Sequence, residues 1–176
     1  MRISAGQKWS VAIMAVSVNL VFVYAAGMFT PVSYGLMLFS ALATYALTCE
    51  ALYGTALLAY VVTGGIALFI VPDKLTAVLY LALMGHYPVF KSYVDSRGIN
   101  RLAAWCVRLL YCNLWLIAGI CFVLFISGQH MPADLPVPVW ACVLIIEAGF
   151  IVMDIIHSVF RKIYVEKFRT GIVPKR

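Results

Sequence analysis

Residues Ala51–Val71, ALYGTALLAYVVTGGIALFIV, form a run of 21 residues without a charged side chain, and this run decides the fold. A helix rises about 1.5 Å per residue, so roughly 20 apolar residues cross a hydrocarbon layer about 30 Å thick. The run stops at Pro72-Asp73-Lys74, where proline removes a backbone donor and Asp73 can cap a following helix. We therefore expect one transmembrane helix here, followed by a turn and a new helix.

The same pattern recurs on both sides of this run. Apolar stretches bounded by proline, charged or other polar residues predict six crossings, at residues 9–29, 34–49, 51–71, 75–90, 102–127 and 139–160. In this scheme Lys91 ends the fourth crossing, and residues 91–101 form a polar connector. A four-crossing alternative, with the second to fourth runs forming one crossing and re-entrant pieces, stays open.

The composition excludes a water-soluble domain. Of 176 residues, 64% are hydrophobic and 11% are charged, far from the balance of soluble proteins. The length suits one compact all-α bundle over residues 1–176. Although the formal charge is +6, the basic residues cluster between apolar runs, where lipid phosphates are the nearest anions. Membrane lipids are thus expected as partners, and nucleic acid is not.

The basic residues predict the orientation of the bundle, because lysine and arginine near span ends are retained in the cytoplasm. Six crossings place almost all of them on one side: Arg2, Lys8, Lys91, Arg97, Arg101, Arg108 and every basic residue from Arg161 onward. Lys74 is the exception. Both termini are therefore predicted to be cytoplasmic, in a multi-pass membrane protein.

Small residues recur every fourth position in the third predicted crossing: Ala51, Thr55, Ala59, Thr63 and Ala67. This spacing places them along one stripe of a helix. Small side chains let a second helix approach closely, which is a main source of helix association in lipid. The stripe predicts either a packing seam inside the bundle or a docking face for another subunit.

Three polar residues fall near the centres of their crossings: Asn19, Asn113 and Glu147. An ionised carboxylate there costs roughly 2.5 kcal/mol or more, so Glu147 should face the bundle interior, a hydrated cavity or a partner. One interpretation is an uncharged acid hydrogen-bonded to Asn19 or Asn113 as a structural clasp. The other is a site for a ligand or a proton.

Asp154 and His157 follow Glu147 on roughly the same face of the last crossing. Asp154 lies at a depth that Arg108 or His86 could reach, and pairing would make its charge tolerable. We expect a structural salt bridge. A metal site built from Asp154, His157 and His86 has loose spacing and no further ligand pattern, so no metal is predicted.

The predicted outer turns carry polar and aromatic residues that could rim a pocket opening outward: Tyr34, Asp73, Lys74, Gln129, His130, Asp134 and Trp140. Tyr34 and Trp140 also suit an interfacial aromatic belt, and Asp73 a helix cap. Together with the three central residues, they give the candidate substrate-binding set: Asn19, Tyr34, Asp73, Lys74, Asn113, Trp140 and Glu147.

No catalytic or phosphate-binding motif is found in the sequence, so neither an enzyme nor a cofactor is expected. An intramembrane enzyme acting on lipid would need Glu147, Asp154 or His157.

The six apolar runs, together with four segments in the middle of the chain, resemble the S components of energy-coupling factor (ECF) vitamin transporters. The segments are Ala51-Leu52-Tyr53-Gly54, Thr63-Gly64-Gly65, Pro72-Asp73-Lys74 and Gly85-His86-Tyr87-Pro88-Val89-Phe90-Lys91. The resemblance implies a membrane subunit that captures a vitamin-like solute from outside and is driven by a T subunit and paired ATPases. It also implies a location in the plasma membrane of a bacterial or archaeal cell.

One feature departs from that family. Many S components carry Ala-x-x-x-Ala in the first helix for docking to the T subunit, whereas here Ala12 is followed by Val16, and Ala15 by Asn19. The departure favours an alternative function, a non-transporting interaction protein of similar shape that forms homo-oligomers or docks to another membrane subunit.

Overall fold

The computed structural model describes residues 5–127 and 139–168, and the regular elements in these ranges are all helices. Five of them are long and apolar enough to cross a bilayer. They are α1 (Ala5–Met28), α2 (Ser33–Cys49), α3 (Tyr53–Ile70), α6 (Arg101–Ser127) and α7 (Val139–Ile163). A short 3₁₀ turn, η1 (Thr30–Val32), precedes α2, and a π-helical turn, η3 (Tyr164–Phe168), follows α7. Five apolar helices of this length are typical of a multi-pass α-helical membrane protein.

The fourth predicted crossing differs from the expectation of one continuous helix. It consists of α4 (Lys74–Leu79), a π-helical turn η2 (Tyr80–Met84) and α5 (Tyr87–Ser96). Pro88 explains the break, because its ring lacks an amide hydrogen and clashes with the carbonyl four residues earlier. The prediction that Lys91 ends this segment is wrong, since α5 continues for five further residues to Ser96.

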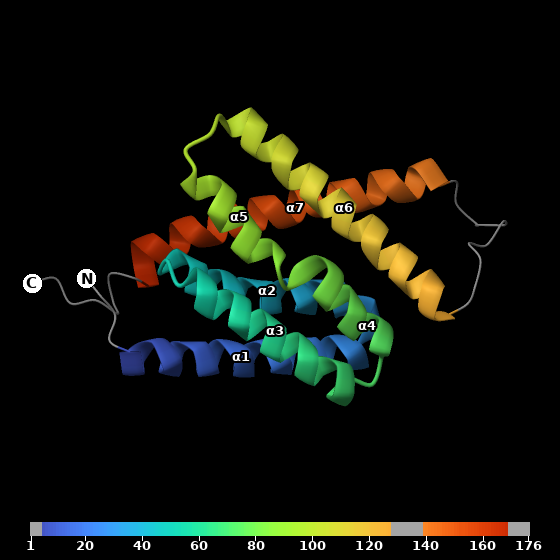
Figure 1. Ribbon diagram of the computed structural model, residues 1–176, viewed down its shortest axis with the longest axis horizontal. Helices are drawn as coiled ribbons and strands as arrows, with labels where there is room; N and C mark the ends of the chain where they lie inside the picture. Colours follow the sequence, from blue (N-terminus) through green and yellow to red (C-terminus); the bar gives the residue numbers. More distant parts are fainter. Residues whose placement is uncertain (1–4, 128–138, 169–176) are drawn as a thin grey trace, which may run out of the picture.

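The broken segment still leads from one end of the bundle to the other (Figure 1). It begins where α3 ends and finishes where α6 begins. We call the end that holds the start of α1, the α5–α6 connection and the end of α7 the basic end, because Lys8, Arg97, Arg101, Arg161 and Lys162 belong to those segments. The turn between α3 and α4 lies at the opposite end.

Helices α1, α2 and α3 form the best-packed part of the bundle and lie side by side (Figure 1). Their interior is built largely from small side chains, which let the backbones approach closely. Two clusters of buried residues fill it: Val23, Ala26, Met37, Ala67, Val71, Ala77 and Tyr80 in one, and Ala15, Leu47, Ala56 and Ala59 in the other.

Helices α6 and α7 cover the other side of α2 and α5 and are much less enclosed. Only 11% of the most apolar stretch of α6 and 17% of that of α7 is buried, against 44% for α2. A small cluster of Tyr87, Cys112, Phe150 and Met153 joins them to α5. Most of their apolar surface is therefore left for lipid or a partner, and the charged site described next lies between them and α5.

Candidate functional site

A cluster of charged side chains lies between α5, α6 and α7, and Lys91 is at its centre. Lys91 projects from the middle of α5 and is 1% exposed. Its Nζ lies 2.7 Å from Oδ1 of Asp154 on α7 and 3.7 Å from Oδ2 of Asp95, one helical turn further along α5. The Tyr87 hydroxyl also donates to Asp154 Oδ1, over 2.5 Å. One carboxylate on α7 is thus held by two side chains of α5.

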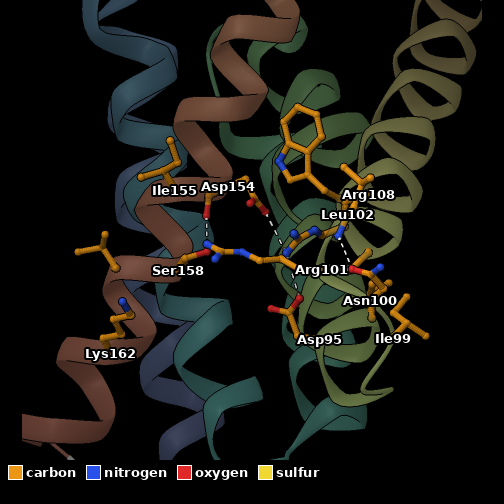
Figure 2. Close-up of a pocket in the computed structure, with 14 residues that line it drawn as sticks. Asp95, Ile99, Asn100, Arg101, Leu102, Arg108, Asp154, Ile155, Ser158 and Lys162 are labelled. Carbon is orange, nitrogen blue, oxygen red and sulfur yellow. Dashed lines mark hydrogen bonds and ion pairs between the residues drawn. The ribbon is translucent and has the colours of Figure 1, made fainter.

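Arg108 brings α6 into the same cluster (Figure 2). Its Nη1 lies 2.9 Å from Asp95 Oδ1 and 3.4 Å from Asp154 Oδ1. Arg161, near the end of α7, approaches Asp95 Oδ2 at 3.8 Å. The predicted pairing of Asp154 with Arg108 is confirmed, and the two carboxylates join three helices.

The cluster holds more positive than negative charge. Lys91, Arg108 and Arg161 face Asp95 and Asp154. Moreover, Nε of Arg108 is buried and has no hydrogen-bond partner. Charged groups taken out of water are tolerated only when they are paired and hydrogen-bonded, so the excess of positive charge favours an anionic partner.

A cavity of about 860 Å³ lies beside this cluster, between α5, α6 and α7. Arg108 and Asp154 line its inner part, whereas Arg101 and Lys162 are exposed (Figure 2). The full lining is Val94, Asp95, Ile99, Asn100, Arg101, Leu102, Ala104, Trp105, Arg108, Asp154, Ile155, Ser158, Val159 and Lys162. The lining contains none of the six members of the predicted substrate-binding set whose side chains the structure describes, which are Asn19, Tyr34, Asp73, Lys74, Asn113 and Glu147.

The three central polar residues do not form one cluster. Asn113 Nδ2 on α6 donates to Glu147 Oε1 on α7 over 2.6 Å, so Asn113 is the partner of Glu147 and Asn19 is not. Asn19 lies elsewhere, between α1 and α2, where its Nδ2 donates to Thr44 Oγ1 over 2.9 Å. The Glu147–Asn113 pair ties the two loosely packed helices together away from the cavity lining.

His86 and His157 have partners other than Asp154. His86 Nε2 donates to the Ala82 carbonyl over 2.8 Å, and its ring packs among aromatic rings that include Trp115. His157 Nδ1 donates to the Met153 carbonyl over 2.8 Å. The suggested pairing of His86 with Asp154 is therefore not seen. In the described ranges no group of three potential ligands among histidine, cysteine, aspartate and glutamate is placed to hold a metal.

At the opposite end, Asp73 is the cap of α4, as predicted. Its carboxylate accepts hydrogen bonds from the amides of Leu75 and Thr76, at 3.1 and 3.2 Å, and from the Thr76 hydroxyl. The bond from the Thr76 hydroxyl is the main reason that the pKa of Asp73 is lowered. Lys74 Nζ donates to the Val71 carbonyl over 2.9 Å. Both residues therefore have structural partners in the turn.

Of the remaining predicted rim residues, Tyr34 is the one whose side chain the structure describes. Tyr34 is 64% exposed near the start of α2. Trp140 belongs to the first turn of α7, but its side chain, like Gln129, His130 and Asp134, lies outside the described residues.

The small-residue stripe of α3 is largely inside the bundle. Ala59, Thr63 and Ala67 are at most 2% exposed, whereas Thr55 is half-buried and Ala51 lies in the turn before α3. The burial agrees with an internal packing seam and leaves only the start of the stripe accessible to another subunit.

Sequence reasoning missed Lys91 and Tyr87 as members of the site. A lysine that follows an apolar run indicates the end of a span, and Tyr87 stands out only as part of the family-like segment. The Lys91-x-x-x-Asp95 spacing, which places opposite charges one helical turn apart, was the available signal.

No protein-family model, curated protein or solved structure matches this chain. The fold and the site together define an all-helical bundle of bilayer-length apolar helices with a charged cavity at its basic end.

Proposed function

We propose that this chain is a solute-binding membrane subunit, and that it holds an anionic, vitamin-like small molecule in the cavity at the basic end. The observation that carries the proposal is the position of Arg108. This buried arginine lines a cavity of about 860 Å³, together with the exposed basic residues Arg101 and Lys162.

The cavity has the size and lining of a small-molecule site. Such sites usually measure about 300–1,000 Å³ and combine apolar walls with a few oriented polar groups. Here Trp105 offers an aromatic surface on which a flat ring can stack. Asn100 and Ser158 supply neutral polar groups on the same lining.

The charge of the lining favours an anion. Arg101, Arg108 and Lys162 outnumber Asp95 and Asp154, which gives the lining a net charge of +1. Arginine binds carboxylate and phosphate groups through charge-assisted hydrogen bonds in a fixed geometry. A carboxylate or phosphate of the ligand would accept from Arg108 and lie near Arg101 and Lys162.

The cost of the cluster supports a functional role. Replacement of a buried ion pair by apolar residues is often neutral or stabilising, so packing alone does not require five charged groups between three helices. Ionisable residues inside membrane-spanning bundles more often serve solute or ion binding.

The resemblance to S components of ECF transporters is the basis for the physiological context that we propose. A T subunit and paired ATPases would supply the energy, because the sequence has no nucleotide-binding motif. The positive-inside pattern would place the basic end, and hence the cavity, on the cytoplasmic side. The solute would then be held where it leaves the protein, and not in the outer pocket expected from the sequence.

Thermal unfolding of the purified protein with a panel of vitamins and related anions tests this proposal. A bound ligand raises the Tm, since it stabilises only the folded state. The increase should be lost in Arg108→Gln. It should persist in Arg97→Gln, which removes an exposed arginine of the same end that is outside the cavity. An unchanged Tm of the wild type across the whole panel would contradict the proposal.

A second candidate is a membrane interaction protein, and the poor enclosure of α6 favours it. Large apolar side chains of α6 such as Leu110, Leu114 and Phe125 are more than half exposed. Native mass spectrometry in mild detergent separates the two functions. A discrete oligomer without a bound small molecule would support assembly.

A further inference from the structure

The charged cavity is open where α6 and α7 diverge toward the basic end (Figure 1). The start of α6 contributes Arg101 and Leu102 to one side of this opening, and the end of α7 contributes Ile155 and Lys162 to the other (Figure 2). Although they line the cavity, Leu102 is 69% exposed and Ile155 is 55% exposed. The opening therefore presents apolar side chains to the surroundings of the bundle.

The two basic residues at the opening form no ion pair within the described ranges. Arg101 is the first residue of α6, and Lys162 is the last but one of α7. Both side chains are exposed, and neither belongs to the ion pairs of the charged cluster. Arg108 and Arg161, by contrast, each pair with Asp95. The positive charges of Arg101 and Lys162 are thus available to an anion from outside the protein.

The chemistry of the opening changes with distance from the helix ends. At about 1.5 Å per residue, Trp105 lies about 6 Å from Arg101 along α6, and Ile155 about 10 Å from Lys162 along α7. Charged groups therefore come first, followed by an aromatic ring and then by aliphatic side chains. A phospholipid has the same order, because its phosphate lies at the membrane boundary and its acyl chains lie in the hydrocarbon layer.

We propose that an anionic phospholipid of the surrounding leaflet docks in this opening. Its phosphate binds Arg101 and Lys162, and an acyl chain packs against Leu102, Ile155 and Val159. Arginine binds phosphate through charge-assisted hydrogen bonds, and lysine adds a point charge. Basic pockets between membrane helices are known to bind anionic headgroups.

The net charge of the lipid decides between the classes of phospholipid. A zwitterionic headgroup carries an ammonium group that the same two basic residues would repel, whereas a headgroup such as glycerol adds no positive charge. Anionic lipid is therefore the better match for a lining with an excess of positive charge. The lipid would close the open side of the cavity and leave Arg108, in its inner part, for the solute. The inference does not rest on solute binding.

Native mass spectrometry of the protein from micelles with equal amounts of phosphatidylglycerol and phosphatidylcholine tests the proposal. We expect the wild type to retain phosphatidylglycerol preferentially. The double variant Arg101→Gln/Lys162→Gln should bind it more weakly, by roughly fivefold for each basic residue removed. Lys8→Gln/Arg97→Gln is the matched control, because it removes the same charge from exposed residues of the basic end that are outside the cavity lining. It should bind like the wild type.

Three results would overturn the proposal. Equal retention of the two lipids by the wild type would do so without any variant. Equal weakening in both double variants would show general attraction to the basic end and no built site. Glycerol phosphate, the headgroup without acyl chains, should not displace the lipid; displacement would assign the site to a free phosphate.

Arg108→Gln separates this inference from the proposed function. The variant should lose the response to the solute and keep the preference for phosphatidylglycerol, because Arg108 lies in the inner part of the cavity and is paired with Asp95 and Asp154. Loss of the lipid preference in Arg108→Gln would contradict a lipid site at Arg101 and Lys162. Failure of the solute panel would leave the lipid result unaffected.

Discussion

Lys91 of α5 and Asp154 of α7 form an ion pair of 2.7 Å, although 63 residues separate them in the chain. Lys91 is 1% exposed, so it has little access to water as a substitute partner. The pair fixes the broken fourth segment against the last helix and forms one side of the charged cavity.

Loss of Asp154 should destabilise the protein more than loss of Lys91. Asp154→Asn leaves buried Lys91 with only Asp95 at 3.7 Å, and an uncompensated buried charge costs about 3–5 kcal/mol. In Lys91→Met, Asp154 keeps Arg108 and Tyr87 as partners. Equilibrium unfolding in detergent micelles measures both free energies, with the double variant completing a thermodynamic cycle. A larger loss in Lys91→Met than in Asp154→Asn would contradict this assignment of partners.

Gly85, between η2 and α5, should not tolerate a side chain. A Cβ there would lie 2.4 Å from Tyr60 Cδ2 and 3.0 Å from Tyr80 Cζ, both atoms of packed aromatic rings. We expect Gly85→Ala to destabilise by about 1–3 kcal/mol, as overpacking usually does. Gly65→Ala is the control, because nothing lies within 4 Å of its Cβ position; it should be neutral or stabilising. Similar Tm values for the two variants would show that the bend is not tightly packed.

Asp73 should give the turn before α4 a pH-dependent stability. The hydrogen bond from the Thr76 hydroxyl lowers the pKa of this carboxyl. Its contribution is therefore present above the ordinary carboxyl pKa and is lost as the pH falls through the lowered value. At neutral pH, Asp73→Ala should cost about 1 kcal/mol, and the difference from wild type should shrink in acid. Asp73→Asn, which keeps a capping oxygen, should cost less. Urea unfolding between pH 7 and pH 3 measures these differences, and a constant difference would contradict the capping role.

Glu147 should act as a hydrogen-bond acceptor for Asn113. Glu147→Gln keeps an oxygen at the position of Oε1 and should leave the stability almost unchanged. Glu147→Leu removes the acceptor for Asn113 Nδ2 and should cost about 0.6–1.7 kcal/mol, the range for interhelical hydrogen bonds in membranes. Thermal unfolding compares the two. A large destabilisation by Glu147→Gln would indicate that the charge itself is required.

Much of the fold could be predicted from the sequence because apolar length and turn residues act locally. Five of the six predicted runs are helices of bilayer length, and the Asp73 cap lies where the Pro72-Asp73-Lys74 signal placed it. The break at residues 80–86 was missed, although Pro88 was a local signal for it. The close packing of Gly85 against Tyr60 and Tyr80 at this bend could not be predicted, because it depends on which helices are neighbours.

The site was predictable only in part. Asp154 and Arg108 were paired correctly because an isolated charge at that depth requires a partner. Lys91 was missed because a lysine beside an apolar run also resembles a span end, and only the continuation of α5 to Ser96 places it inside. The separation of Asn19 from Glu147 depends on which helices are neighbours, and periodicity does not determine that.

The most direct test of the proposed function is the affinity of the best-stabilising anion for three proteins, measured by isothermal titration calorimetry. Our account predicts that Arg108→Gln weakens binding at least about tenfold, the loss of one charge-assisted hydrogen bond, whereas Glu147→Gln binds like the wild type. Weakened binding in Glu147→Gln with unchanged affinity in Arg108→Gln would place the ligand in the pocket around the central polar residues and contradict a site in the charged cavity.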